Sequence, residues 1–408
     1  MMSQDTERYN VGGVWLSQPF KIRRLGHVGI TIRDMDRSLQ FYRDLIGFKV
    51  TDWYPFDLRF PEAMKDPAFR DAKTVFMRYA GDHHSFVLLN RPAHAILEAD
   101  PARRYEGGIT IQQMSWQVGT LREVVNADEW LHTLGVETQR AGRDMPGSNW
   151  HTYFYDVNGY INELFYGMEQ IGWSGFSKPA PMHARLFDER PPLPQMSEYA
   201  EVNNARAEGV DLLSGMRDDE LPETYDVDGI LLARPFKVTQ IGPIGLFVPD
   251  VDDTARFYQS RMGFRLTESV TYRGYTVHYL RVNTEHHSLA LFPMPLRETL
   301  QWSAETTTAF IGIQVANFAQ LKAAYEFLSR RGVPIASWPR ELMPGIDYAF
   351  WARDPDGHHL LFYYRMDQVG WSGVPRARTT GHSDPREWPE VIEDDYAYQG
   401  MPYLGPLG

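Results

Sequence analysis

Three side chains of the metal-ligand type stand at related places in one half of a duplicated sequence, and the other half has lost two of them. The segment LGHVGITIRDMDRSLQFYRDLIGF (25–48) recurs as IGPIGLFVPDVDDTARFYQSRMGF (241–264), DHHSFVLL recurs as EHHSLALF, and DVNGYINELFY recurs as DPDGHHLLFYY. The first copy carries His27, His84 and Glu163 where the second carries Pro243, His287 and Leu361. Two histidines and one carboxylate are the ligand set of a non-haem Fe(II) centre with open positions. The sequence therefore predicts one metal site, in the first half, and a second half that supports it.

Each of these residues has an ordinary structural alternative. A lone His27 is more often a polar residue at the start of a strand, and only its pairing with the other two positions argues for metal. If His83 and His84 head a strand, their side chains point to opposite faces. Glu163 stands amid the apolar residues Ile161, Leu164 and Phe165, where burial without a partner is costly, and the alternative is a solvated sheet face.

Tyr153 and His151 are candidates for proton transfer. If residues 157–159 form a three-residue hairpin loop with Gly159 left-handed, Tyr153 falls opposite Glu163 on the same face, and His151 shares that face by alternation. A two-residue loop would instead send both side chains to the other face, where they would be packing residues.

Composition and charge limit the classes of protein to consider. The chain has 408 residues, of which 43% are hydrophobic and 23% charged, as in an ordinary globular protein large enough for two domains. Its net charge of −12 and the absence of a basic run argue against a nucleic-acid partner. No apolar stretch is long enough for a membrane span and the first ten residues are polar, so we expect a cytoplasmic protein. Because the chain has no cysteine, any metal must be held by His, Asp or Glu.

Element patterns predict an α+β fold of four βαβββ modules, paired into two homologous domains with curved mixed sheets. In the first module a strand at HVGITI is followed by a helix within 34–47 and by strands FKVTDWY, TVFMRYA and HHSFVLL. The same order recurs three times. We expect a metal-binding domain over 19–167, a connector or covering segment over 168–233, a structural domain over 234–366 and an extended arm over 367–408.

These features together resemble the vicinal oxygen chelate superfamily, and the four-module arrangement is similar to the two-domain type I extradiol ring-cleaving dioxygenases. The resemblance rests on the strand and helix opening around His27, the His83-His84 pair and the ending DVNGYINELFY. It implies a metal held by His27, His84 and Glu163, with Tyr153 at the place of the active-site tyrosine. It further implies Fe(II), with Mn(II) as an alternative, and a small aromatic diol and O2 as substrates. We also expect a homo-oligomer.

The sequence departs from the family pattern in ways that bear on the reaction. The metal of two-domain members usually sits in the C-terminal half, whereas here only the first half keeps the ligands. The family histidine nine positions before the tyrosine is replaced by Asp144, and no histidine lies between His27 and His83. Two other functions therefore stay open: a metal-dependent isomerase, hydrolase or lyase of the same superfamily, and a non-catalytic protein that binds a small aromatic compound.

Overall fold

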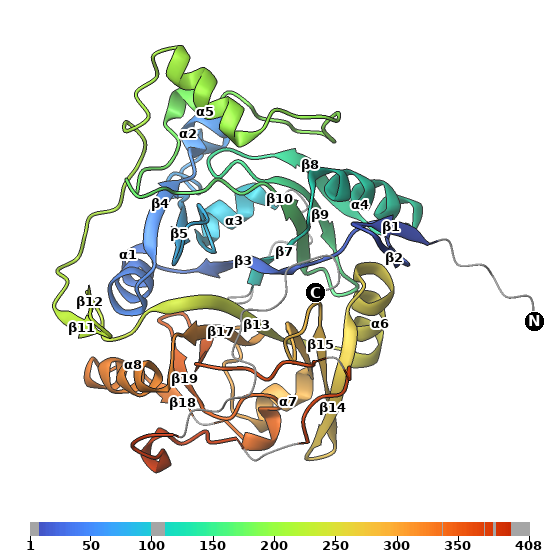
Figure 1. The fold of residues 1–408 in the computed structure, drawn as a ribbon, viewed down its shortest axis with the longest axis vertical. Coiled ribbons are helices and arrows are strands. Elements are labelled where there is room, and N and C mark those ends of the chain that lie inside the picture. Colours follow the sequence, from blue (N-terminus) through green and yellow to red (C-terminus); the bar gives the residue numbers. More distant parts are fainter. Residues whose placement is uncertain (1–7, 99–110, 337, 371, 378–380, 393–408) are drawn as a thin grey trace, which may run out of the picture.

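The computed structural model describes residues 8–98, 111–336, 338–370, 372–377 and 381–392. The two halves of the duplicated sequence lie one above the other, each built on its own mixed eight-stranded sheet (Figure 1). The strand orders are β4-β5-β6-β3-β7-β10-β9-β8 and β14-β15-β16-β13-β17-β20-β19-β18, so the two sheets have the same topology. The predicted α+β fold with four modules and two homologous halves is confirmed.

The elements of the first half are β3 (Arg24–Ile32), α1 (Met35–Leu39), the π-helix η1 (Gln40–Ile46), β4 (Lys49–Trp53), α2 (Phe56–Arg59), η2 (Ala63–Lys65), β5 (Thr74–Arg78), β6 (Phe86–Asn90), α3 (Arg91–Leu97), β7 (Ile111–Gln117), α4 (Leu121–Thr133), β8 (Thr138–Arg143), β9 (Trp150–Tyr155) and β10 (Ile161–Tyr166). Those of the second half are β13 (Val238–Val248), α6 (Val251–Met262), β14 (Arg265–Tyr272), β15 (Tyr275–Arg281), β16 (Leu289–Pro293), α7 (Met294–Thr299), β17 (Thr308–Val315), α8 (Phe318–Arg330), β18 (Ile335–Ala336), η5 (Arg340–Leu342), β19 (Ala349–Arg353) and β20 (His359–Tyr363).

The first helix of each half shows why the repeated residues form the same element. Asp34 and Asp250 are N-caps whose side chains accept a backbone N–H of the first turn, and Gly47 and Gly263 end the helices in the left-handed conformation. The predicted regular helix over 34–47 differs in one respect, because its second part winds as the π-helix η1. This wider turn still places Phe41, Tyr42 and Ile46 in the core.

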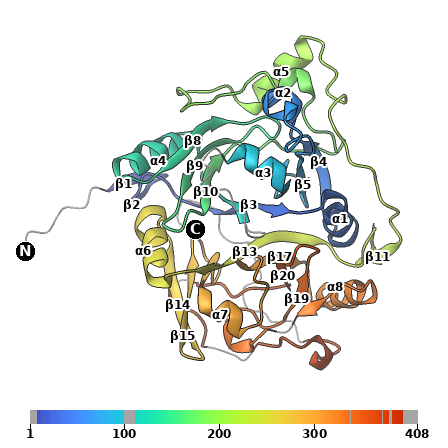
Figure 2. The same cartoon turned by 180° about the vertical axis from the view of Figure 1, so that it is seen from behind.

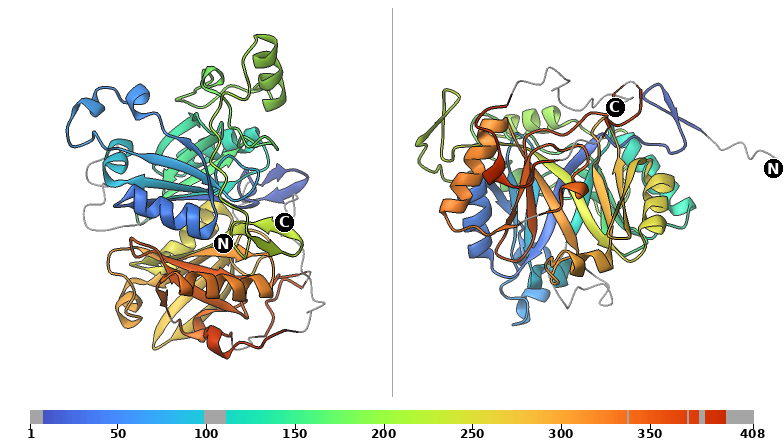
Figure 3. Two further views of the ribbon diagram at one scale, coloured as in Figure 1. Left: turned by 90° about the vertical axis from the view of Figure 1, so that its left-hand side faces the viewer. Right: turned by 90° about the horizontal axis from the view of Figure 1, so that it is seen from below.

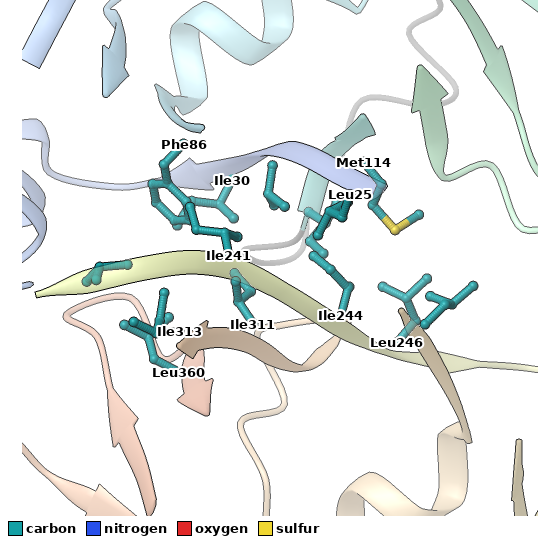
Figure 4. Close-up of a cluster of buried hydrophobic side chains, with 14 of the residues drawn as sticks. Leu25, Ile30, Phe86, Met114, Ile241, Ile244, Leu246, Ile311, Ile313 and Leu360 are labelled. Atoms are coloured by element: carbon teal, nitrogen blue, oxygen red, sulfur yellow. The ribbon is translucent and has the colours of Figure 1, made fainter. Parts of the chain in front are cut away.

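The largest core cluster lies between the two sheets and joins the halves. Leu25 and Ile30 of β3 face Ile241 and Ile244 of β13 across this layer (Figure 4). Helices α1 and α8 lie along one side of the molecule, and α4 and α6 lie along the other (Figures 1 and 2). The opposite face of each sheet therefore points away from the shared core, and it is there that a site can form.

Two similar hairpins precede the sheets. These are β1 (Tyr9–Val11) with β2 (Val14–Leu16), and β11 (Tyr225–Val227) with β12 (Ile230–Leu232), and they lie at opposite sides of the molecule (Figure 3). The segment between the halves also contains η4 (Ala180–Met182) and α5 (Glu198–Ala207), and the final part contains η6 (Pro385–Glu387). The predicted connector is ordered, and Glu201 of α5 forms a buried ion pair of 2.8 Å with Arg143 of β8. No helix within the described residues is long and apolar enough to cross a membrane.

Candidate metal centre and its cavity

Successive side chains of a strand point to opposite faces of its sheet. One face of the first sheet packs on the shared core, and we call the other face the cup. On β3, Val28 and Ile30 belong to the shared core, so His27 between Gly26 and Val28 points to the opposite, concave side. On β10, Leu164 belongs to the same core and Glu163 points into the cup. The predicted solvated alternative for Glu163 is wrong, because this residue and His27 are both fully buried.

The hairpin between β9 and β10 has the predicted register. Gly159 has a φ of 84°, Asp156 pairs with Tyr160 through a 3.0 Å backbone hydrogen bond, and Tyr153 lies directly opposite Glu163. The three-residue loop is thus confirmed, and with it the shared face of Tyr153 and Glu163.

His27 and Glu163 form the centre of the cup. The His27 Nε2 atom lies 2.8 Å from Glu163 Oε2, yet neither ring nitrogen of His27 has a hydrogen-bond partner of acceptable geometry in the described structure. An unsatisfied imidazole in a fully buried position is costly. A cation bound between the imidazole and the carboxylate would satisfy both, so this pair fits a metal.

Polar groups surround the Glu163 carboxylate, but no lysine or arginine in the described residues pairs with it. Asn149 Nδ2 donates to Oε1 at 2.6 Å, the Ser115 hydroxyl donates to Oε2, and Gln113 Nε2 lies 3.4 Å from Oε2. Burial alone would raise the pKa of the Glu163 carboxyl, but its charge interactions with His27 and His151 and the Ser115 hydrogen bond hold that pKa below its usual value. The side chain is therefore a carboxylate, as metal binding requires.

The expectation that His83 and His84 head a strand is wrong. Both residues precede β6, which begins at Phe86, and both are buried. Their Nδ1 atoms lie 3.0 Å apart, and His83 Nε2 lies 2.9 Å from Asp52 Oδ2. Because the bend before β6 is not extended strand, the alternation rule does not apply there.

This chain of contacts fixes the tautomer of His84. The Asp52 carboxylate accepts from His83 Nε2, and with one proton on the His83 ring its Nδ1 accepts from the Nδ1–H of His84. Burial, with added repulsion from His27 and His83, lowers the pKa of His84 well below its usual value. His84 is therefore neutral, with its lone pair on Nε2, and its ring centroid lies 4.5 Å from that of His27.

A further donor that the sequence comparison missed is Gln113 of β7. His27 and Gln113 each stand seven residues before the N-cap of the next helix, Asp34 and Thr120 respectively, so they are equivalent positions in the first and second modules. The shared spacing to the N-cap was the signal that could have found it. Gln113 is buried and its Nε2 faces Glu163 Oε2, so a flip of the amide would present its oxygen there instead.

The side chains of the cup do not yet form a complete ligand shell. Within the described ranges, no group of three or more His, Asp or Glu side chains has its donor atoms arranged to hold a metal ion. His27 and Glu163 satisfy the requirement for two donors. His84 and the amide group of Gln113 are the candidates for a third donor, since both line the cavity beside this pair.

A cavity of about 410 Å³ opens beside this pair and is large enough for a small aromatic molecule. Its lining includes Tyr54, Phe60, Phe76, His84, Gln113, Arg140, Asp144, Asn149 and Tyr153. The Arg140 guanidinium lies 4.8 Å from the Tyr153 ring centroid and pairs with Asp144. Asp144, which replaces the family histidine, is thus neutralised within the cavity wall.

Tyr153 and His151 occupy different places around the site. Tyr153 lines the cavity, whereas His151 is fully buried, is not part of the described lining, and has Nδ1 3.9 Å from Glu163 Oε1. Burial lowers the pKa of His151 to about 4, and burial together with Glu163 raises that of Tyr153 well above 10. The predicted direct access of His151 to a substrate is therefore not what the structure shows. The tyrosine is a protonated donor near neutral pH.

Comparison with known proteins shows which family has this architecture. The model of the Glyoxalase/Bleomycin resistance protein/Dioxygenase superfamily matches residues 24–164 and 240–362, which together make up more than half of the chain. The chain belongs to this superfamily. No curated protein matches it at a comparable level.

Solved structures of the superfamily share the fold at low identity. The 2,3-dioxygenase LapB from Pseudomonas sp. KL28 has a TM-score of 0.55 and 15% identity, covering 87% of this chain and 96% of its own. Homoprotocatechuate 2,3-dioxygenase from Brevibacterium fuscum, in complex with 3,4-dihydroxyphenylacetate, has a TM-score of 0.54 and 16% identity over 88% and 85% of the two chains. The Mn(II)-bound glyoxalase from Novosphingobium aromaticivorans has a TM-score of 0.53 and 15% identity over 95% and 93%. These matches establish the fold, and they span more than one reaction of the superfamily.

The second half of this superfamily member fills its own cup with apolar side chains. The positions equivalent to His27, Gln113 and Glu163 hold Pro243, Phe310 and Leu361. Leu361 pairs with Trp351 across the strands, and both are buried in a cluster with Phe310, Trp338 and Tyr279. The same sheet topology therefore supports a polar cup in one half and a packed core in the other.

The Asp52–His83–His84 chain provides a first test of the ligand set. We expect Asp52→Asn to weaken metal affinity by roughly 10- to 100-fold, because the carboxylate no longer holds His84 in the tautomer with a free Nε2. The second half supplies the matched control, since Glu268 lies 3.2 Å from His286 and His286 contacts His287 in the same way. Glu268→Gln should leave affinity unchanged in a metal titration. An unaffected Asp52→Asn variant would exclude His84 as a ligand and favour Gln113.

Proposed function

We propose that the protein is a metal-dependent dioxygenase that opens the ring of a small aromatic diol in the cup of the first half. The observation that carries this proposal is the buried pair of His27 and Glu163, in which neither imidazole nitrogen has a well-formed hydrogen bond and the carboxylate pairs with no lysine or arginine among the described residues. We further propose His27, His84 and Glu163 as the ligands, with Gln113 as the competing third donor. An ion of Fe(II), or of Mn(II), would supply open positions for two adjacent substrate oxygens and for O2.

The cavity suits the proposed substrate in size and in chemistry. Aromatic side chains from Tyr54, Phe60 and Phe76 line it, and such rings pack well against a planar ring. Its lining also carries polar side chains, and two of them, Gln113 and Asn149, contact Glu163. A diol bound with its hydroxyl groups toward His27 and Glu163 would place its ring against the aromatic wall.

Ring opening requires a proton to leave a diol hydroxyl and a proton to reach the oxygen released later. His84 is neutral and can accept the first proton when it is not a ligand. Tyr153 is protonated and faces the cavity, so it can donate a hydrogen bond or a proton to a developing oxyanion. His151, whose Nδ1 lies 3.9 Å from Glu163 Oε1, is proposed as a residue that positions the carboxylate.

The deciding experiment is anaerobic loading of the purified protein with Fe(II), followed by a panel of catechols and hydroquinones. Oxygen uptake and the visible absorbance of ring-opened semialdehydes are recorded together. Stoichiometric oxygen consumption with a yellow product supports the proposal. Tight metal binding without oxygen uptake for any diol would contradict it.

A second candidate is a metal-dependent isomerase or lyase that acts on a chelating substrate without O2. It is favoured by Gln113, because an amide oxygen in place of an imidazole gives a harder donor set that suits Mn(II). The structural likeness to a Mn(II)-bound glyoxalase covers 95% of the chain. Oxygen-independent turnover of the Mn(II)-loaded protein would favour this candidate.

Tyr153→Phe tests the proposed proton donor. We expect turnover to fall by roughly 10²-fold with near-normal metal content, because the variant removes only the hydroxyl that faces the substrate. The measurement pairs steady-state kinetics with metal analysis of the same sample. Tyr166→Phe is the matched control, since Tyr166 at the end of β10 is exposed and does not belong to the described lining of the cavity. Equal turnover in Tyr153→Phe and the wild type would remove Tyr153 from the mechanism.

A further inference from the structure

A hollow of about 220 Å³ on the second half gathers three cations. Lys21, from the segment that leads into β3, lies beside Arg265 at the start of β14 and Arg281 at the end of β15. Arg265 and Arg281 face each other directly across the strand pair. No carboxylate belongs to the described lining, which is completed mainly by Asn283, Thr284 and backbone. Like charges directly opposite each other are destabilising, so this arrangement calls for a counter-charge.

The contacts of the three cations leave their charge uncompensated. Within the described part of the chain none of them forms an ion pair, although Lys21 Nζ donates to the Val282 carbonyl and Arg281 Nη1 donates to Thr267 Oγ1 at 3.0 Å. Burial, together with Arg265, Arg23 and Arg281, lowers the pKa of Lys21 to about 8. The chain has a net charge of −12 and many acidic side chains, yet none of those described pairs with this cluster.

The duplication provides a second copy of the same cluster, and acidic side chains line that copy. Lys237 leads into β13, and Lys49 faces Arg78 across β4 and β5, in the arrangement of Lys21, Arg265 and Arg281. Here the connector brings Asp218, Asp219 and Glu220 to the lining of the hollow.

Asp218 is anchored in this place and acts on the cations. Its carboxylate pairs with Arg43 at 3.0 Å and accepts the Val50 backbone N–H at 2.9 Å. Burial lowers the pKa of Arg78, and Asp218 opposes that shift. Carboxylate oxygens therefore already serve one copy of the cluster.

We propose that Lys21, Arg265 and Arg281 form a binding site for a small oxyanion group, a phosphate or a carboxylate, at the junction of the two halves. The planar guanidinium groups of two arginines present paired N–H donors that match the oxygens of such groups. The size of the hollow suits one such group rather than a large ligand. The site is separate from the metal cup, which opens on the other half.

The test is thermal unfolding of the full chain in inorganic phosphate, in acetate and in sodium chloride at matched ionic strength. We expect a saturable rise in Tm with phosphate or with acetate, but not with chloride, since a ligand that binds only the folded state stabilises it. The more effective of the two anions identifies the source of the oxyanion. A rise of equal size in chloride would overturn the proposal, because screening alone would then explain it.

Two double variants make the test specific. The variant that combines Arg265→Gln with Arg281→Gln should lower the affinity for the anion by about ten-fold or more, because charged hydrogen bonds to the ligand are lost. Lys49→Gln with Arg78→Gln, at the copy that acidic side chains line, should keep the wild-type response. Arg265→Gln alone is the second variant, since Arg265 is exposed and its loss does not disturb the core. An anion response that survives all Arg265 variants would contradict the site.

Discussion

The variant that combines His27→Ala with Glu163→Ala is expected to lose its metal entirely, from about one ion per chain to none. The two residues lie 2.8 Å apart and are fully buried, so removing both leaves only His84 and Gln113 as candidate donors among the described residues of the cup. A site that loses two of three ligands does not bind tightly. Elemental analysis of dialysed protein measures the result, and circular dichroism verifies that the variant is folded.

Single variants then identify the third donor. His84→Ala and Gln113→Ala remove the two candidates one at a time, and we expect only one of them to weaken metal affinity by roughly 10- to 100-fold or more. His287→Ala in the second half is the matched control, because it removes the corresponding histidine from a cup whose other positions are apolar. Two ions per chain in the wild type, or an ion retained after loss of both His27 and Glu163, would show that the metal is held elsewhere.

The fold could be predicted because its determinants are repeated along the chain. Four times, a strand with alternating apolar residues is followed by a capped helix, and the N-caps Asp34, Thr120, Asp250 and Asn317 stand two or three residues after the end of the preceding strand. The left-handed Gly159 fixed the hairpin register, which placed Tyr153 opposite Glu163. Both inferences rest on local backbone geometry, which short stretches of sequence encode well.

The predictions about the site that were wrong concern side chains whose positions depend on contacts between residues far apart in the sequence. His83 and His84 follow a bend, so strand alternation did not apply to them, and the Asp52 contact that orients them comes from another strand. The sequence pattern did not indicate Gln113 as a metal ligand, because an amide is a rare ligand, although the position of Gln113 matches that of His27. His151 lies close to Glu163, as predicted, but it is fully buried and does not belong to the described lining of the cavity.

The contrast between the two cups shows what the duplication changed. The shared core between the sheets needs apolar residues on one face of β3 and β13 alike, so that face is kept in both halves. The opposite face is free to vary, and it holds His27, Gln113 and Glu163 in the first half but Pro243, Phe310 and Leu361 in the second. One half can thus lose its polar cup without any loss to the core that joins the two.

Placing a carboxyl group in the second cup is expected to destabilise the protein strongly. Leu361 is only 2% exposed and packs among Trp351, Phe310 and other aromatic side chains, so Leu361→Glu buries an acid without a partner. We expect the free energy of unfolding at pH 8 to fall by about 3–5 kcal/mol, the usual scale for an uncompensated buried charge. Urea unfolding followed by tryptophan fluorescence measures it.

The pH dependence separates a buried acid from a wet one. Burial would raise the folded-state pKa of the new carboxyl above its unfolded value of about 4.3. The unfolded state then loses its proton first as pH rises, so the penalty grows between pH ~4.3 and the raised folded pKa and is smaller at pH 5 than at pH 8. Leu361→Gln, which has nearly the same shape and no charge, should be destabilised by the same amount at both pH values. If Leu361→Glu unfolds like the wild type at pH 8, the second cup admits water, and its apolar lining does not explain why the two halves differ.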